Sequence, residues 1–197
     1  MRLLYAPASP YSAKVRMMAH ALKLDVKAEK VDTASEPGIL MSSNPLGKIP
    51  VLLLKDGQAV YDSRVIMQVF DQLSGGSVFP GDDTTKTKAL VLEATADGIN
   101  DCLLAIVYER RFHPPEKIHE PWIDRQKAKV VRSLDHLNGM DLAINTGITG
   151  GHCAVAAMLG YLDLRFPGEF PGDRPNLAAF VQDFEKSFPD YSAMKPQ

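Results

Sequence analysis

The stretch from residue 44 to residue 73 constrains the fold of this chain more than any other. It runs NPLGKIPVLLLKDGQAVYDSRVIMQVFDQL. The apolar run at 51–54 has the length of a buried strand, and the Asp56-Gly57 pair after it favours a tight hairpin turn. A return strand at 58–61 and a helix with one apolar face complete the unit. The stretch therefore predicts a β-hairpin that leads directly into a helix.

The residues before this stretch predict further alternation of strands and helices. Residues 2–6 form a short apolar run of strand length, and Pro10 suits the first position of a helix for which Ser9 is a natural N-cap. Residues 26–31 alternate as a second strand does, and residues 36–42 form a weak helix. The predicted order is β-α-β-α-β-β-α within about 75 residues.

Beyond this unit the strand signals fade. The segment SGGSVFPGDD interrupts the pattern, and the remainder contains only helical periodicity. We expect helices at 84–112, 121–138, 149–166 and 176–187, the third apolar nearly all round and therefore central. The chain should thus form an α/β domain over residues 1–75, a linker over 76–83 and an all-α domain over 84–197.

Composition and charge exclude several classes of protein. The 197 residues are 45% hydrophobic and 23% charged, with a formal net charge of −2, so no basic excess suggests nucleic-acid binding. Only Cys102 and Cys153 are present, far apart, which argues against a disulfide framework or a metal site. No apolar run reaches the roughly 18 residues of a membrane span, and no signal peptide is visible, so the cytoplasm is the expected location.

Two motifs at their spacing carry a family resemblance. NPLGKIPVL at 44–52 followed by DSRVI at 62–66, within this order of elements, resembles the cytosolic-type glutathione S-transferases. The resemblance implies a thioredoxin-like N-domain and a helical C-domain. It also implies a cytoplasmic homodimer that conjugates the glutathione thiolate with a small electrophile in detoxification. Glutathione is then a co-substrate, and no metal or tightly bound cofactor is implied.

The resemblance assigns glutathione-binding roles to several residues of the first domain. Pro50 is expected to follow a cis peptide bond, which turns the backbone of Ile49 toward an extended ligand as an added strand edge would be. Asp62 and Ser63 open a helix whose free N–H groups and positive dipole end favour the γ-glutamyl carboxylate. Asp62 stands where many members have glutamate. Lys48 is a candidate for the glycyl carboxylate.

Ser9 is the candidate catalyst, with Tyr5 as the alternative. Ser9 and Ser12 occupy the cysteine positions of a glutaredoxin-like C-P-Y-C pattern, so no thiol remains for disulfide exchange. A serine hydroxyl at a helix N-terminus can instead donate to the glutathione thiolate and lower the thiol pKa. Tyr5 lies where other members place a catalytic tyrosine. Ser9 as a plain cap and Tyr5 as a core aromatic remain the structural alternatives.

The helical domain offers further candidates by the same resemblance. Asp101 matches a position from which some members reach the glutathione amine of the partner subunit. Tyr108, Arg111 and Phe112 are candidates for the electrophile pocket, and the Arg110-Arg111 pair would suit an acidic co-substrate. TGGH at 149–152 resembles a capping box in which His152 replaces the usual aspartate.

Two other functions stay open at this point. The same thiolate would serve a glutathione-dependent peroxidase or isomerase. A non-catalytic, transferase-like protein that binds a protein partner would keep the fold, although such proteins often lose glutathione-site residues. Ser9, Pro50, Asp62 and Ser63 are all present, which favours an enzyme.

Overall fold

Short strands with apolar centres build a four-stranded sheet near the start of the chain. The computed structural model describes residues 1–145 and 147–197. The strand order is β2-β1-β3-β4, in which β1 pairs parallel with β2 and antiparallel with β3, and β3 pairs antiparallel with β4. The strands are β1 (Arg2–Tyr5), β2 (Lys27–Lys30), β3 (Val51–Leu53) and β4 (Ala59–Val60).

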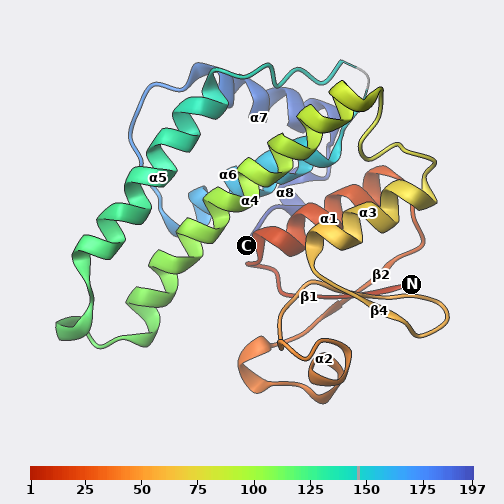
Figure 1. The fold of residues 1–197 in the computed structure, drawn as a ribbon, viewed down its shortest axis with the longest axis horizontal. Helices are drawn as coiled ribbons and strands as arrows, with labels where there is room; N and C mark the ends of the chain where they lie inside the picture. Colours follow the sequence, from red (N-terminus) through yellow and green to blue (C-terminus); the bar gives the residue numbers. More distant parts are fainter. Residues whose placement is uncertain (146) are drawn as a thin grey trace.

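Alternation along the strands gives the sheet two apolar faces. Leu3 and its cross-strand partner Leu52 belong to the main core, whereas Leu4 and its partner Val51 belong to a smaller cluster with Leu40. Helices α1 (Pro10–Ala21) and α3 (Ser63–Leu73) cover the first face, and α2 (Gly38–Ser43) covers the second (Figure 1). The predicted order β-α-β-α-β-β-α is confirmed, with a 3₁₀ turn η1 (Thr33–Ser35) before α2.

The rest of the chain is helical, as predicted. Its elements are α4 (Asp83–Phe112), the 3₁₀ turn η2 (Pro115–Lys117), α5 (Glu120–Asn138), α6 (Gly150–Arg165), α7 (Pro175–Ser187) and α8 (Tyr191–Met194). Helix α8 was not predicted, because four residues carry little helical signal of their own. It is held by packing, since the Tyr191 hydroxyl donates to the Ala156 carbonyl oxygen of α6 at 2.9 Å.

Helix α6 is the central helix of this half. Its side chains are buried along most of its length, and it packs against α4 and α1. Gly151 permits the close approach to α4, because a Cβ there would meet the Ala89 carbonyl oxygen at 2.9 Å. The predicted capping box is present: the Thr149 N–H donates to His152 Nδ1 at 3.1 Å, and the His152 N–H donates to Thr149 Oγ1 at 3.3 Å.

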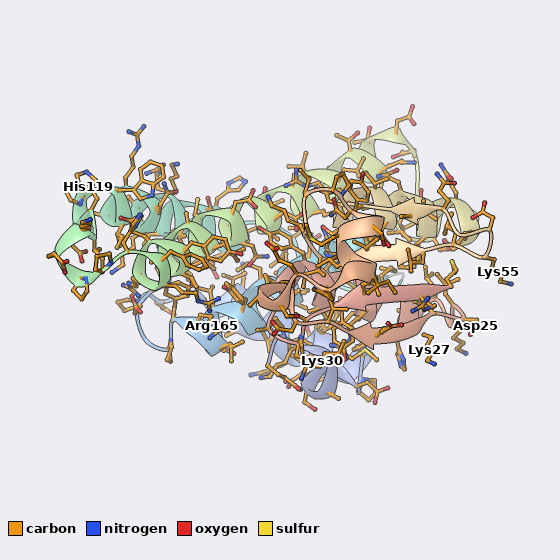
Figure 2. All side chains as sticks on the ribbon, turned by 90° about the horizontal axis from the view of Figure 1, so that it is seen from below. Asp25, Lys27, Lys30, Lys55, His119 and Arg165 are labelled. Carbon is orange, nitrogen blue, oxygen red and sulfur yellow. The ribbon has the colours of Figure 1, made fainter. Side chains whose placement is uncertain are left out.

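The two halves extend in opposite directions along the molecule. Figure 2 shows Lys55 of the β3–β4 hairpin near one end and His119, before α5, near the other. Helices α1 and α3 lie between the sheet and the helical half, so the loops at one edge of the sheet face α4 and α6. Within the described part of the chain, every helix is too short or too polar to cross a membrane.

Candidate active site

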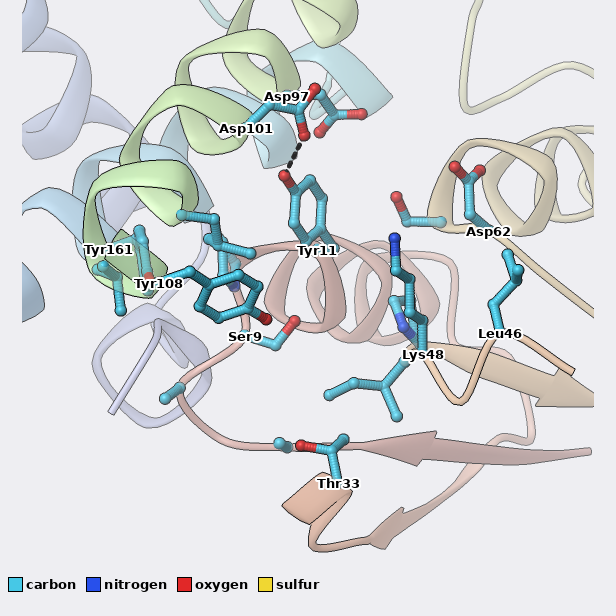
Figure 3. A pocket seen from close by; sticks show the side chains of 18 of the residues that line it. Ser9, Tyr11, Thr33, Leu46, Lys48, Asp62, Asp97, Asp101, Tyr108 and Tyr161 are labelled. Atoms are coloured by element: carbon cyan, nitrogen blue, oxygen red, sulfur yellow. Dashed lines mark hydrogen bonds between the residues drawn. The ribbon is translucent and has the colours of Figure 1, made fainter. Parts of the chain in front are cut away.

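A cavity of about 630 Å³ lies between the loops of the sheet half and helices α4 and α6. Its wall combines the turn before α1, the loop from residue 44 to residue 50, the N-terminus of α3, and one face each of α4 and α6. Figure 3 shows Ser9 near the middle of the cavity. Lys48 and Asp62 lie to one side of it, and Tyr108 and Tyr161 to the other.

The fold gathers most of the predicted site residues around this one cavity, although they span a hundred positions of sequence. Those that line it are Ser9, Lys48, Ile49, Pro50, Asp62, Ser63, Asp101, Tyr108 and Arg111. Tyr5 and Phe112 are not part of its wall.

Ser9 is the N-cap of α1, and its geometry leaves the hydroxyl hydrogen available. The Ser12 N–H donates to Ser9 Oγ at 3.1 Å, so the cap uses the oxygen only as an acceptor. A hydroxyl has one hydrogen to donate and two lone pairs. Capping α1 and donating to a ligand are therefore compatible, at the positive end of the α1 dipole.

The loop from residue 44 to residue 50 is held from within. The buried Asn44 donates through Nδ2 to the Lys48 carbonyl oxygen at 2.8 Å and accepts from the Leu46 N–H at 3.0 Å. The Ile49–Pro50 bond is cis, as expected. Ile49 lines the cavity, and in the residues that the structure describes no hydrogen bond uses its backbone.

The N-terminus of α3 provides an anion-binding end. Asp62 is the N-cap and accepts from the Arg64 N–H at 3.0 Å through Oδ1. Ser63, the first residue of the helix, is buried beside the cavity. The first N–H groups of a helix have no intrahelical partner, so the Ser63 N–H and hydroxyl can both serve a bound carboxylate.

Behind this end lies a buried ionic cluster that joins α1, α3 and α4. Lys14, which is 1% exposed, contacts Glu93 Oε1 at 2.8 Å and Asp97 Oδ2 at 2.8 Å. Arg64 reaches the same Asp97 Oδ2 through Nε at 3.0 Å. Burial raises the pKa of Glu93, with Lys14 opposing, and the hydrogen bond to Asp97 raises the pKa of Arg64. Asp97 therefore has two cationic partners, and both halves of the molecule are tied together beneath the cavity.

Asp101 lines the cavity of its own chain, and its expected reach to the partner subunit stays a prediction. The hydroxyl of Tyr11, in the first turn of α1, donates to Asp101 Oδ1 (Figure 3). Burial, followed by this hydrogen bond, raises the pKa of Tyr11, so its hydroxyl stays protonated. The Tyr11 hydrogen is thus directed to Asp101.

The far end of the cavity is formed by α4 and α6. Tyr108 and Arg111 of α4 line it together with Tyr161 and Arg165 of α6. Burial raises the pKa of Tyr161, while the nearby charges of Arg165 and Arg111 oppose this. Phe112, expected in this wall, is 70% exposed at the last position of α4 and contacts the edge of Tyr108 instead.

Tyr5, the alternative catalyst, lies in a different environment from Ser9. The guanidinium of Arg16 lies 4.6 Å from the centre of its ring, so a cation–π contact covers the aromatic face outside the cavity wall.

Sequence reasoning missed Tyr11, Arg64, Asp97 and Arg165. Two of these carried a usable signal, because Asp97 precedes Asp101 by four residues and Arg165 follows Tyr161 by four, and such pairs share a helix face. Tyr11 carried none beyond its place in SPYS.

Comparison with known proteins decides the family. Residues 8–73 match the N-terminal domain of the glutathione S-transferases, and residues 120–183 match their C-terminal domain. The chain is also 34% identical over 147 residues to the uncharacterized GST-like protein YibF of Escherichia coli (strain K12), which covers 71% of each chain. The chain belongs to the glutathione S-transferase family.

Solved structures of other glutathione S-transferases share the whole fold. A glutathione S-transferase of Methylobacillus flagellatus KT with glutathione bound is 35% identical and superposes with a TM-score of 0.89, over 100% of this chain and 99% of that one. A glutathione transferase family member of Pseudomonas fluorescens Pf-5, with bound S-(propanoic acid)-glutathione, is 37% identical with a TM-score of 0.85 over 100% of both chains. The thioredoxin-like sheet half and the helical half are thus those of a glutathione S-transferase.

Proposed function

We propose that this protein is a glutathione transferase that joins the glutathione sulfur to a small electrophile. Glutathione lies extended along the Ile49 backbone, and Ser63 at the start of α3 holds its γ-glutamyl carboxylate. Lys48 lies within the wall of the same cavity and supplies a cation for the glycyl carboxylate. The glutathione-binding domain would span residues 1–75 and the electrophile-binding domain residues 84–197, joined by the linker 76–83.

One observation carries this proposal. Ser9, Ile49 and the first residues of α3 all line a single cavity, and among the described residues neither the Ser9 hydroxyl hydrogen nor the Ile49 backbone has a hydrogen-bond partner. These are the three kinds of group that a thiolate, an extended peptide backbone and a carboxylate need. Relatives with glutathione or a glutathione conjugate bound support glutathione as the ligand.

Ser9 is the proposed thiolate-stabilising residue. Its O–H donates to the sulfur, and the dipole of α1 favours the negative charge, so the thiol pKa falls from about 8.5 toward neutrality. The thiolate then attacks the electrophilic carbon, and the leaving group departs with the bonding electron pair. The protein contributes orientation of the two reactants and stabilisation of the thiolate.

Calorimetric titration with reduced glutathione, followed by conjugation of chlorodinitrobenzene, tests the proposal. We expect one binding site per chain and a roughly 100-fold loss of kcat in Ser9→Ala, since a lost donor to a developing or bound anion has effects of this order. Ser12→Ala is the matched control, because the buried Ser12 hydroxyl has no hydrogen-bond partner in the described residues.

Two outcomes would count against it. No binding at millimolar glutathione would exclude the glutathione site and favour a protein-binding role. Full activity in Ser9→Ala with loss in Tyr5→Phe would move the catalytic role to Tyr5. We also propose a cytoplasmic homodimer on the family resemblance, which analytical ultracentrifugation and cell fractionation test.

A further inference from the structure

Helix α4 runs along the cavity, and the side chains that it contributes to the wall change from acidic to basic along its length. Asp97, Asp101, Tyr108 and Arg111 all line the wall from this one helix. Fourteen residues separate the first from the last, which is about 21 Å along a helix axis. The carboxylates therefore lie at the glutathione end, and the arginine lies at the opposite end.

Adjacent arginines of α4 have different environments. Arg110 forms a two-point ion pair with Glu169, at 3.1 Å from each nitrogen, and lies outside the cavity wall. Arg111 lines the cavity and has no carboxylate partner among residues 1–145 and 147–197. Of the two, only Arg111 is therefore available to a ligand.

A second arginine joins Arg111 from α6. Arg165 lies one turn after Tyr161 on the same helix face and lines the cavity. It is exposed and extends from α6 in Figure 2, and it too lacks a carboxylate partner within the described part of the chain. Tyr108, Arg111, Tyr161 and Arg165 all line the cavity from α4 and α6, and the charges of both arginines oppose the rise in the pKa of Tyr161 that burial causes.

The charges along the cavity wall are unevenly distributed. Its carboxylates are Asp62, Asp97 and Asp101, and each already has a partner: the Arg64 N–H, the ionic cluster and the Tyr11 hydroxyl. None lies at the α4–α6 end, where two guanidinium groups and two phenols converge. A guanidinium presents a planar fork of donors that matches a carboxylate.

We propose that the electrophile itself carries a carboxylate, which Arg111 and Arg165 bind at the α4–α6 end of the cavity. This inference rests on the proposed function and adds the class of its second substrate, an acidic electrophile. The tyrosines flank the body of this substrate, and the arginines orient its reactive carbon toward the sulfur near Ser9.

With an acidic aryl halide, the proposed reaction is a substitution of the halide by the glutathione sulfur. The thiolate sulfur forms a bond to the ring carbon, the carbon–halogen bond breaks, and halide leaves with its electron pair. For an unsaturated acid, the sulfur adds to the β-carbon and the α-carbon takes a proton from water. In both cases the carboxylate remains unchanged and stays paired with the arginines.

Binding of two ready-made glutathione conjugates tests the inference without requiring turnover. One conjugate is made from a chlorodinitrobenzoate with chlorine para to the carboxylate, and the other from its methyl ester. We expect the acid conjugate to bind about 10-fold more tightly by calorimetry, equivalent to about 1.4 kcal/mol. Arg111→Gln and Arg165→Gln should each reduce this preference to about 3-fold, and the double variant should abolish it.

Arg110→Gln is the matched control, because it removes the same charge one residue away and outside the cavity. It should retain the full preference for the acid conjugate. Thermal denaturation of each variant checks that the fold is kept.

Three results would overturn the inference. Equal affinity for the two conjugates would show that the protein does not recognise a carboxylate on the electrophile, and the proposed glutathione site would be unaffected. Equal weakening of free glutathione and both conjugates in Arg165→Gln would assign that arginine to glutathione instead. Failure of both conjugates and of glutathione to bind would overturn the proposed function, and this inference with it.

Discussion

The two ends of the cavity are built by different means. At the end proposed for glutathione, the backbone of Ile49 and the N-termini of α1 and α3 act together with short side chains such as Ser9 and Ser63, backed by the buried cluster around Lys14. At the α4–α6 end, the proposed binding groups are side chains in the exposed last turns of the two helices, namely Arg111 and Arg165.

The difference indicates how the two ends respond to substitution. Backbone groups keep their position whatever the side chain, provided that the fold beneath them is stable. Side chains on a helix face can be exchanged with little cost to stability. We therefore expect the glutathione end to depend on the fold and the α4–α6 end to be open to change in specificity.

The largest expected effect comes from breaking the cluster beneath the glutathione end. Lys14→Met leaves Glu93 and Asp97 buried without their ammonium partner, and loss of one partner of a buried pair costs about 3–5 kcal/mol. We expect about 3 kcal/mol, because Arg64 still pairs with Asp97. Urea unfolding measures the loss.

Arg165→Gln is the comparison at the other end and should change the free energy of unfolding by less than about 0.5 kcal/mol. Similar losses in Lys14→Met and Arg165→Gln would contradict the contrast between the two ends.

The next effect concerns glutathione affinity. Ser63→Ala removes a hydroxyl donor to a bound carboxylate, and a hydrogen bond to a charged group contributes about 1.5–3 kcal/mol. We expect glutathione to bind about 10-fold more weakly, measured by calorimetry, with the remaining affinity supplied by the backbone N–H groups. Complete loss of binding would show that the side chain, rather than the helix terminus, holds the carboxylate.

Protonation of His152 provides a third effect, at a distance from both ends. Burial lowers the pKa of His152, with Asp141 opposing, and its Nδ1 must be unprotonated to accept from the Thr149 N–H. The unfolded chain, with a pKa near ~6.5, therefore binds the proton more readily than the folded chain. The contribution to stability is complete above about pH 6.5 and is lost as pH falls toward and through the lowered pKa of the folded state.

His152→Asp sharpens this test, because a carboxylate keeps the capping box down to a lower pH. Between about pH 8 and about pH 5, the wild type should lose about 1 kcal/mol more than the variant in urea unfolding. Equal losses would show that the imidazole does not sense pH.

The smallest effect is expected at Tyr11. Its hydroxyl donates to Asp101, so it is not directed to the glutathione sulfur. Tyr11→Phe should change kcat/KM for conjugation by less than about 3-fold, and the free energy of unfolding by about 0.5 kcal/mol. A loss as large as that of Ser9→Ala would place a second hydroxyl in the thiolate site.

The sequence predicted the elements well because each has local signals. The hairpin at 51–61 follows from apolar alternation and the Asp56-Gly57 turn, and α1 and α3 follow from Ser9 and Asp62 as caps. The gathering of Ser9, Ile49 and Ser63 around one cavity was also predictable, because these residues belong to contiguous motifs with a known family resemblance, whereas their roles toward glutathione stay predictions.

The ionic cluster and the α4–α6 end were harder to predict from sequence. Lys14 and Glu93 are 79 residues apart, and only the packing of α1 against α4 brings them together. Arg110 and Arg111 are neighbours in sequence, yet Arg110 pairs with Glu169 whereas Arg111 lies in the cavity wall. Such pairings depend on how helices meet, which no local pattern encodes.

The ionic cluster also limits how this protein can recombine with its relatives. Lys14 lies in the sheet half, whereas Glu93 and Asp97 lie in the helical half. A chimera could join this sheet half to the helical half of another family member. The buried ammonium group of Lys14 would then have no carboxylate partners, unless that member had carboxylates at the positions of Glu93 and Asp97. Exchange of substrate specificity between family members is therefore expected to be easier through the exposed last turns of α4 and α6 than through the exchange of whole halves.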